Sequence, residues 1–369
     1  MQKVVESYNE WDPLEEVIVG TVTGAMYPEV SPILAANGEP EWLLHYQGEF
    51  VEEEFIEKAN EQLENLVALF EDANIKVRRP APHAHNVEYQ TPNWRCRSGW
   101  NTANPRDLFL VVGDEVIECA SPLRHRYFES QAYHSLMTQY FKQGARWTAA
   151  PKAPLRDSLY DHSFLLSERS ENDSDADKIL QEGETHRYPI NESEPVFEAA
   201  DFVRCGKDLF VTQSIATNAL GIEWVRRHLG DRYRVHEIKT RCKATWHIDT
   251  TFMPLAPKKA LINPQWVHEV PDALKDWDLR AAPMPSYLQT SPMAHPYFTS
   301  QWLSMNVFSI DEKRVCVDAQ QVDMIHMLRE WGFTPIAIPF DYVGMFGGSF
   351  HCVTLDIKRK GTLQSYCEP

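Results

Sequence analysis

One local pattern recurs five times along the chain and constrains its fold more than any other feature of the sequence. In each copy an amphipathic helix ends, a short turn with Gly, Asp or Asn follows, and a segment suited to a strand begins. Gly and Asn tolerate the left-handed conformation that ends a helix, and the β-branched or aromatic residues after the turn favour a strand. The copies lie at residues 69–77, 140–147, 228–235, 274–280 and 328–336. Five such units predict an α/β fold with internal pseudo-fivefold symmetry, although ordinary α/β proteins also alternate helices with strands.

The clearest predicted helix precedes the first copy of the pattern. Its apolar side chains fall three or four positions apart and are those of Phe55, Ala59, Leu63, Leu66, Val67 and Phe70. Short apolar runs predict strands at residues 16–20, 108–112, 209–211, 315–317 and 351–355. The polar, acidic segment 157–194 is expected to be a surface excursion. Because no linker divides the chain, we expect a single domain over residues 1–369.

The charge balance and the cysteines exclude several classes of protein. A formal net charge of −17 disfavours nucleic acid as a partner and suits a cationic small molecule. The 7 cysteines are widely spaced and include no Cys-x-x-Cys pair, so neither a disulfide framework nor a zinc ribbon is expected. The N-terminus lacks a basic and then apolar leader, and no uncharged run approaches the roughly 18 residues of a membrane span. We therefore expect a cytoplasmic protein without membrane or nucleic-acid partners.

The strongest local signal for chemistry is a glycine-rich turn that leads to Cys352. Gly347, Gly348 and Ser349 let the backbone bend tightly and approach a ligand, and a following strand would hold the thiol at the edge of a cleft. The turn is not a phosphate loop, because no Gly-Lys-Ser or Gly-Lys-Thr follows. A cysteine in a cytoplasmic protein can equally be a small buried hydrophobic residue, so a nucleophile needs support from other residues.

A histidine and several carboxylates supply that support. His247 and Asp249 would share one face of a strand and pair a proton carrier with an anion, although His247 could also be a satisfied core residue. Glu198 and Asp201 flank two alanines in an apolar stretch, and Asp107 enters an apolar strand; each could also be a cap or a structural ion pair. Together with a cysteine these groups suit chemistry on a guanidinium, whose N–H donors pair with carboxylates while its carbon faces a thiolate.

Beyond these residues, nearly the whole chain resembles the arginine amidinotransferases. That family includes glycine amidinotransferase, the inosamine-phosphate amidinotransferases and enzymes of cyanobacterial toxin pathways. The segments that carry the resemblance occur in the family's order and are Arg106-Asp107, His247-Ile248-Asp249 and Gly347-Gly348-Ser349-Phe350-His351-Cys352. Residues 200–206 and 253–257 resemble the saxitoxin-pathway branch. The resemblance implies a five-bladed α/β propeller with pseudo-fivefold ββαβ modules around a central active site.

The resemblance also implies a reaction. Cys352 would attack the guanidino carbon of L-arginine, and His247 would protonate the departing L-ornithine. The resulting amidino-cysteine would pass its amidino group to a primary amine that His247 deprotonates, with Glu198 orienting His247 and balancing its charge. The residues implied for the donor site are Asp107, Asp249, Thr299 and Ser300. No metal or organic cofactor is implied. The partners are the two small-molecule substrates, and a homodimer is a possible assembly.

Several residues depart from the family pattern. Glu198 stands where the transferases carry aspartate and the arginine deiminases carry glutamate, which keeps a hydrolase of guanidino substrates as the alternative. Trp266 stands where several members have an arginine that grips the donor carboxylate. Ala244 and Trp246 lie in the loop that helps to define the acceptor, and the bulky Trp246 argues against glycine itself. A third interpretation is a non-catalytic propeller that binds a protein surface, but such members lack the nucleophile that Cys352 would supply.

Overall fold

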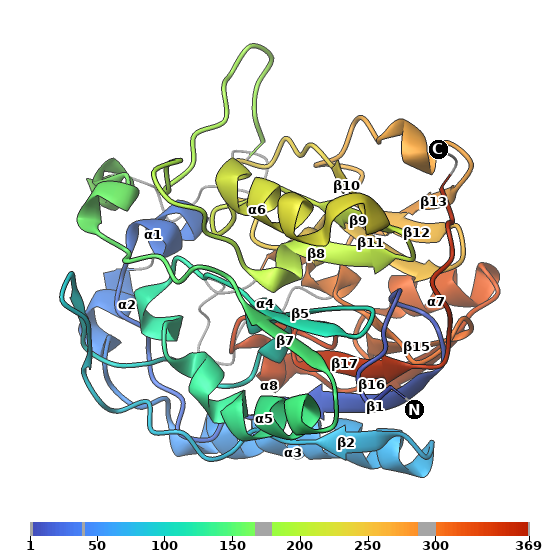
Figure 1. Ribbon diagram of the computed structural model, residues 1–369, viewed down its shortest axis with the longest axis horizontal. Coiled ribbons are helices and arrows are strands. Elements are labelled where there is room, and N and C mark those ends of the chain that lie inside the picture. Colours follow the sequence, from blue (N-terminus) through green and yellow to red (C-terminus); the bar gives the residue numbers. More distant parts are fainter. Residues whose placement is uncertain (1–2, 39–40, 167–178, 287–299, 368–369) are drawn as a thin grey trace.

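The computed structural model is an α/β structure that describes residues 3–38, 41–166, 179–286 and 300–367 (Figure 1). Its helices are α1 (Pro32–Gly38), α2 (Glu41–Tyr46), α3 (Glu53–Asp72), α4 (Pro105–Leu108), α5 (His134–Lys142), α6 (Ala219–Leu229), α7 (Val322–Glu330) and α8 (Asp341–Gly344). Short 3-10 helices lie at Arg124–Arg126, Glu129–Tyr133, Asp157–Leu159, His162–Leu166, Ala199–Asp201, Gly230–Arg232, Ile248–Thr250, Asp272–Leu274 and Gln301–Met305. Within the described ranges, no helix combines the length and the apolar character that a bilayer span requires.

The strands lie between these helices along the whole chain. They are β1 (Leu14–Val19), β2 (Lys76–Arg78), β3 (Tyr89–Gln90), β4 (Arg95–Cys96), β5 (Phe109–Val112), β6 (Glu115–Glu118), β7 (Arg146–Ala149), β8 (Phe202–Cys205), β9 (Asp208–Val211), β10 (Arg234–Glu237), β11 (Phe252–Ala256), β12 (Lys259–Ile262), β13 (Asp278–Ala281), β14 (Phe308–Ser309), β15 (Arg314–Asp318), β16 (Thr334–Ile338) and β17 (Thr354–Arg359). Strands predicted at residues 16–20, 108–112, 209–211 and 315–317 are confirmed as β1, β5, β9 and β15.

Five three-stranded sheets repeat one pattern of pairing. In each sheet the central strand pairs antiparallel with one neighbour and parallel with the other. In the order antiparallel, central and parallel strand, the sheets are β17-β1-β2, β5-β6-β7, β8-β9-β10, β11-β12-β13 and β14-β15-β16. The pairing of β17 with β1 completes the first sheet with the last strand of the chain. A two-stranded sheet, β3-β4, stands outside this pattern.

The recurring sequence pattern supplies the parallel strand of each three-stranded sheet. The five copies end in β2, β7, β10, β13 and β16. Four of them follow α3, α5, α6 and α7 as predicted. Strand β13 follows only the 3-10 helix Asp272–Leu274, so the prediction of an amphipathic helix before it is wrong. Turn residues Asn74, Gly144 and Gly332 have φ values of 60°, 101° and 91°, the left-handed conformation expected at the end of a helix.

Helix α3 shows how the apolar spacing in the sequence becomes packing. Ala59, Leu63, Leu66 and Phe70 are buried on one side of the helix and share a cluster with Val17 of β1. Figure 1 shows α3 running along the sheet that contains β1 and β2. The face predicted to be apolar is therefore the face that covers the sheet.

The prediction of a strand at residues 351–355 is correct only for its last two residues. Strand β17 begins only at Thr354, and Cys352 lies in the turn before it. Gly347 has a φ of 79°, and a Cβ atom built on it would lie 2.7 Å from the ring of Trp100. A Cβ atom on Gly348 would lie 2.5 Å from Oδ1 of Asn104. The two glycines therefore do allow a tight turn, because no larger residue fits against these neighbours.

Buried charges join the sheets near this turn. Arg204 of β8 pairs with Glu10 at 2.7 Å and with Asp356 of β17 at 2.8 Å, and Arg106 of α4 pairs with Asp356 at 2.6 Å. None of these four side chains is more than 5% exposed. Because a buried charge without its partner costs several kcal/mol, these ion pairs hold α4, β8 and β17 in fixed relative positions.

The described parts of the acidic segment 157–194 are only partly a surface excursion. Leu159, Tyr160 and Ile190 are buried in one apolar cluster, and Tyr160 and Ile190 form an isolated β-bridge. The segment is therefore attached to the core at these points, which the polar composition alone did not predict.

Candidate active site

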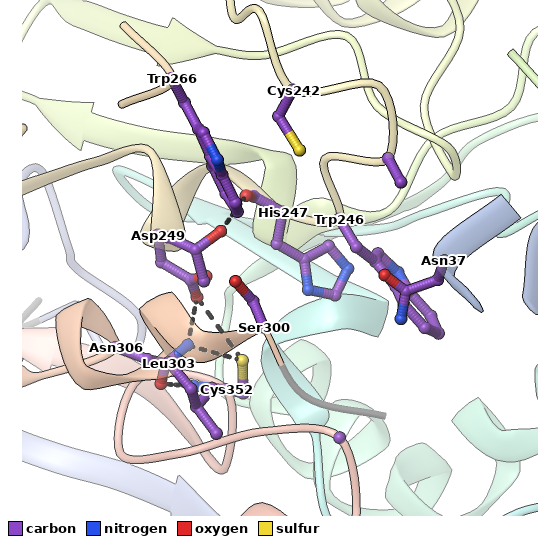
Figure 2. Close-up of a pocket in the computed structure, with 13 residues that line it drawn as sticks. Asn37, Cys242, Trp246, His247, Asp249, Trp266, Ser300, Leu303, Asn306 and Cys352 are labelled. Carbon is purple, nitrogen blue, oxygen red and sulfur yellow. Dashed lines mark hydrogen bonds between the residues drawn. The ribbon is translucent and has the colours of Figure 1, made fainter. Parts of the chain in front are cut away.

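Most of the predicted site residues line or adjoin one cavity (Figure 2). The cavity is open to solvent, and the empty space within it and its mouth amounts to about 560 Å³. The predicted residues in its wall are Cys352, His247, Asp249, Ser300, Ala244 and Trp246. Asp107 and Glu198 adjoin the cavity, where each faces one ring nitrogen of His247. Thr299 lies outside the described residues.

These residues occupy equivalent positions in the repeated sheets. In every three-stranded sheet, one outer strand pairs antiparallel with the central strand. Five site residues each lie two to four positions before one of these outer strands. The residues and strands are Asp107 before β5, Glu198 before β8, Asp249 before β11, Asn306 before β14 and Cys352 before β17. Segments that are distant in sequence therefore bring their polar groups together because each group occupies the same position in its own sheet.

An amide side chain positions Cys352. Asn306 donates from Nδ2 to Sγ of Cys352 at 2.9 Å and to Oδ2 of Asp249 at 2.7 Å. Its Oδ1 accepts the backbone N–H groups of His351 at 2.9 Å and Cys352 at 3.3 Å. The sulfur lies 3.5 Å from Oδ2 of Asp249, and Figure 2 shows these contacts converging below the ring of His247. One amide thus sets the distance between the thiol and the carboxylate.

His247 lies at the start of a 3-10 helix, so the strand predicted for His247 and Asp249 is wrong. Strand β11 begins only at Phe252, and His247 has a φ of 72°, which is unusual for a residue other than glycine. Its Nε2 is 2.8 Å from Oε2 of Glu198, and its Nδ1 is 3.7 Å from Oδ1 of Asp107. Such a conformation costs about 1–3 kcal/mol and persists where the surroundings determine it, and here a carboxylate faces each ring nitrogen.

Arg126, which the sequence analysis missed, holds the acids behind His247. Its Nη1 is 2.6 Å from Oδ2 of Asp107 and 3.2 Å from Oε1 of Glu198. Its Nε and Nη2 donate to both carboxylate oxygens of Glu129, at 2.7 and 3.0 Å. The side chain is 0% exposed. One buried cation therefore serves three carboxylates, two of which contact the imidazole.

Arg126 and Asn306, the two site residues that the sequence did not predict, left little signal in it. Arg126 and Glu129 are three positions apart, a spacing that surface ion pairs also show. Asn306 carries no charge and lies between the apolar residues Met305 and Val307. That polar residue among apolar neighbours was the only hint.

The surrounding charges set the protonation of the site. Burial alone would raise the pKa of Glu198, but Arg126 and His247 lower it to about 2. Burial alone would lower the pKa of His247, but Asp107, the contact with Cys352 and Glu198 raise it well above its usual value. Burial and the charge of Asp249 raise the pKa of Cys352 to about 12. Without a bound cation, the site at neutral pH therefore holds an imidazolium beside a neutral thiol.

The remaining predicted residues divide between the site and its surroundings. Trp246 donates from Nε1 to Oε2 of Glu198 at 3.1 Å, so it contacts this carboxylate as well as the cavity. Ser300 accepts the backbone N–H of Trp302 at 3.1 Å. The carboxylate of Asp201 binds hydroxyl groups at 2.5 and 2.7 Å and does not line the cavity. Of the two acids that flank the alanines, Glu198 is the one that contacts His247.

Three of the site residues also have the chemistry of metal ligands. Asp107, His247 and Cys352 each offer one ligand atom, and these atoms lie within 4.8 Å of one another. A carboxylate, an imidazole and a thiolate are the ligand types that zinc takes. The same geometry serves a nucleophile and its acid–base partners, which need no metal.

Comparison with known proteins places the chain among transferases. No model of a protein family matches it. The L-arginine:L-lysine amidinotransferase of Pseudomonas savastanoi pv. phaseolicola is 40% identical over 98% of this chain and 96% of the relative. The mitochondrial glycine amidinotransferase of Gallus gallus is 40% identical over 98% of this chain and 84% of the relative.

A solved structure agrees with these relatives. The amidinotransferase of the saxitoxin biosynthetic pathway from Microseira wollei has a TM-score of 0.89 and 45% identity, and the match covers 98% of this chain and 99% of that one. All three similar proteins are named as transferases, so the hydrolase alternative is not favoured. The chain belongs to the amidinotransferase family.

Proposed function

We propose that the protein is an L-arginine:amine amidinotransferase that works through a covalent amidino-cysteine and releases L-ornithine and a guanidino product. One observation carries the proposal: ligand atoms of Cys352, His247 and Asp107 lie within 4.8 Å of one another, beside a carboxylate oxygen of Asp249 that is 3.5 Å from the sulfur. A thiol, a proton carrier and two carboxylates around one point suit attack on the carbon of a guanidinium.

The first half-reaction forms the covalent intermediate. The guanidinium of the donor pairs with Asp107 and Asp249, and Sγ of Cys352 bonds to its central carbon. The C–N bond to ornithine then breaks, and His247 delivers a proton to the leaving nitrogen. The buried Oδ1 of Asp107 has no hydrogen-bond partner among the described residues, which supports its role as an acceptor for a guanidinium N–H.

The second half-reaction transfers the amidino group to the amine. His247 removes a proton from the incoming primary amine, whose nitrogen attacks the amidino carbon and frees the sulfur. Glu198 orients the imidazole through the 2.8 Å contact and balances its charge in both halves. We assign acceptor recognition to the loop with Ala244 and Trp246, which lines the cavity beside His247. The lysine and glycine in the names of the relatives indicate that acceptors vary within the family.

In this mechanism the donor itself activates the nucleophile. Burial and Asp249 hold the thiol of Cys352 neutral. A bound guanidinium places positive charge between Asp107 and Asp249, which offsets the negative field at the sulfur and favours the thiolate. The thiol proton then leaves to solvent through the open mouth of the cavity, because His247 is already protonated, and the thiolate forms where its target carbon is in place.

Alkylation of the protein without substrate tests this point. Because the pKa of Cys352 is raised to about 12, its reaction rate with iodoacetamide should rise about tenfold per pH unit from about pH 7 to 10, without a plateau. Peptide mass spectrometry measures the rate at Cys352 and, for comparison, at Cys242, which also lines the cavity. A plateau near neutral pH would mean that the thiolate exists before the donor binds.

We also propose that residues 1–369 form a single amidinotransferase domain in which the five sheets are the blades of a propeller. The shared strand pattern and the closure of the first sheet by β17 support this arrangement. The equivalent positions of the site residues before β5, β8, β11, β14 and β17 support a central site. The proposed partners are the arginine donor and the amine acceptor.

The decisive experiment adds arginine without an amine acceptor. Mass spectrometry should find one amidino group on the peptide that contains Cys352, together with about one ornithine released per site. An unmodified thiol after release of ornithine would contradict the covalent route. Continued formation of citrulline or urea without an amine would show instead that water resolves the intermediate, as in a hydrolase.

A further inference from the structure

His351 lies in the turn before Cys352, and its side chain has no role in the proposed mechanism. The imidazole is 0% exposed and lies between two carboxylates. Its Nδ1 is 3.0 Å from Oδ2 of Asp249, and its Nε2 is 3.4 Å from Oε2 of Glu10. Carboxylate oxygens only accept hydrogen bonds, so the shorter contact makes Nδ1 a donor to Asp249. The ring therefore joins a carboxylate of the active site to a carboxylate of the buried ion pairs.

The carboxylate of Asp249 is held through one of its two oxygens. Oδ2 accepts from Nδ1 of His351 and, at 2.7 Å, from Nδ2 of Asn306, and Sγ of Cys352 lies 3.5 Å from it. Figure 2 shows the contacts with Asn306 and Cys352. The hydrogen bonds that described residues make to this carboxylate all go to Oδ2. Two nitrogen donors on one oxygen fix the plane of the carboxylate and leave Oδ1 for the guanidinium of the donor.

The backbone of His351 is held independently of its ring. Its N–H donates to Oδ1 of Asn306 at 2.9 Å, and its carbonyl accepts Nε of Arg106 at 2.8 Å. On the other side of the ring, Glu10 also accepts Nε of Arg204 at 2.8 Å. Because a satisfied network of buried polar groups is rigid, the ring is anchored to a part of the chain outside the cavity. Replacement of the ring should therefore leave the course of the turn unchanged.

We propose that His351 is a positioning residue that holds the carboxylate of Asp249 in the orientation that binds the guanidinium of the donor. This inference rests on the proposed function. A guanidinium forms two parallel hydrogen bonds only with a carboxylate that faces it correctly. Misplacement of a binding group by about 1 Å can lower the rate about a hundredfold. His351 acts through Asp249 and does not contact the guanidinium itself.

Two substitutions separate the two contacts of the ring. In His351→Asn the amide nitrogen is bonded to Cγ, as Nδ1 is, so it still donates to Asp249 but is too short to reach Glu10. In His351→Gln the amide nitrogen lies one bond further out, near the position of Nε2, so it reaches Glu10 and not Asp249. Both variants replace the ring by an amide, so each is the matched control for the other.

The test measures arginine binding in the Cys352→Ala background, in which no adduct forms, by isothermal titration calorimetry. His351→Gln should raise the Kd for arginine about 10- to 100-fold, the scale of one hydrogen bond to a charged group. His351→Asn keeps that hydrogen bond and should raise the Kd by less than about threefold. With Cys352 present, kcat/KM for arginine should fall in the same order, from wild type to His351→Asn to His351→Gln.

Unfolding in urea reports on the contact with Glu10. If the ring served only the buried ion pairs, His351→Asn would be the less stable variant, because it loses Glu10, and it would also bind arginine less well than His351→Gln. A positioning role predicts the opposite order for arginine binding, whichever variant is less stable.

Three results would overturn the inference and leave the transferase reaction intact. They are a Kd that His351→Gln changes by less than about threefold, an equal loss in both variants, and a greater loss in His351→Asn. Should His351→Gln fail to fold, a folded His351→Asn protein with a Kd raised about tenfold or more would also contradict the inference. If arginine forms no adduct on Cys352 of the wild-type enzyme, the proposed function itself is wrong, and the inference falls with it.

Discussion

Replacement of Cys352 by alanine is expected to lower kcat on the order of 10⁴-fold or more, the scale seen when a covalent nucleophile is removed. Without the sulfur, no amidino-enzyme forms, and the amine would have to attack the guanidinium directly. The side chain is small and lies at a cavity, so the free energy of unfolding should change by no more than about 1 kcal/mol. Release of ornithine measures the activity, and circular dichroism shows that the variant is folded.

Cys242→Ala is the comparison for this variant. Cys242 also lines the cavity and is buried, but it lies outside the group formed by Cys352, His247 and Asp107. The Cys242→Ala protein should still form the amidino adduct at Cys352. Turnover that survives Cys352→Ala, or an adduct found on Cys242, would place the nucleophile elsewhere.

Replacement of Arg126 by methionine is expected to have the largest effect on stability. Removing one partner of a buried ion pair costs about 3–5 kcal/mol, because the other charge is left unpaired. Arg126 is 0% exposed and pairs with Asp107, Glu129 and Glu198. Since three carboxylates lose one cation, the free energy of unfolding measured in urea should fall by the upper end of that range.

The loss should depend on pH in a defined direction. Arg126 and His247 lower the pKa of Glu198 to about 2 in the folded protein, below its ordinary value in the unfolded chain. A carboxylate with a lowered pKa contributes stability that is present above the unfolded pKa and is lost as the pH falls toward the folded pKa. The wild-type protein loses this contribution between about pH 5 and 2, whereas Arg126→Met lacks its arginine part throughout. The two unfolding free energies should therefore converge as the pH falls through this range.

Arg226→Met controls for the loss of an arginine as such. Arg226 pairs with Glu223 on the surface of α6 and has a side chain that is 43% exposed. A surface ion pair of this kind contributes about 0.2–1 kcal/mol, so the change should be small. An Arg126→Met protein as stable as the Arg226→Met protein would mean that the buried carboxylates do not depend on Arg126.

Local signals in the sequence predicted most of the regular structure. The spacing of Ala59, Leu63, Leu66 and Phe70 predicted both the helix α3 and the face that it buries, because helix periodicity and burial are read over a few turns. The amphipathic helix predicted before β13 is absent from the described residues there, where only a single 3-10 turn forms at Asp272–Leu274. There the sequence has the turn and the strand, but no amphipathic stretch of sufficient length.

The sequence singled out residues that the structure brings close together, but it did not predict their backbone conformation. Asp107, Glu198, His247, Asp249 and Cys352 were candidates because charged or reactive groups at the edges of apolar segments are unusual, and the family resemblance implied their roles. The sequence predicts strands for the segments of His247 and Cys352, whereas His247 starts a 3-10 helix and Cys352 lies in a turn. Apolar runs resemble strands, and the point where a strand begins is set by pairing with distant strands.

By itself, the amino-acid sequence determined the repeated helix-to-strand units, the glycine turn before Cys352 and the types of group available for catalysis. These depend on propensity and spacing over a few residues. Only the tertiary structure decided which groups meet: Glu198 reaches His247 at 2.8 Å from 49 positions away, and Asn306 reaches Cys352 at 2.9 Å from 46 positions away. It also decided the raised pKa of Cys352 and the burial of Arg126, because desolvation and the fields of neighbouring charges arise only when distant segments pack together.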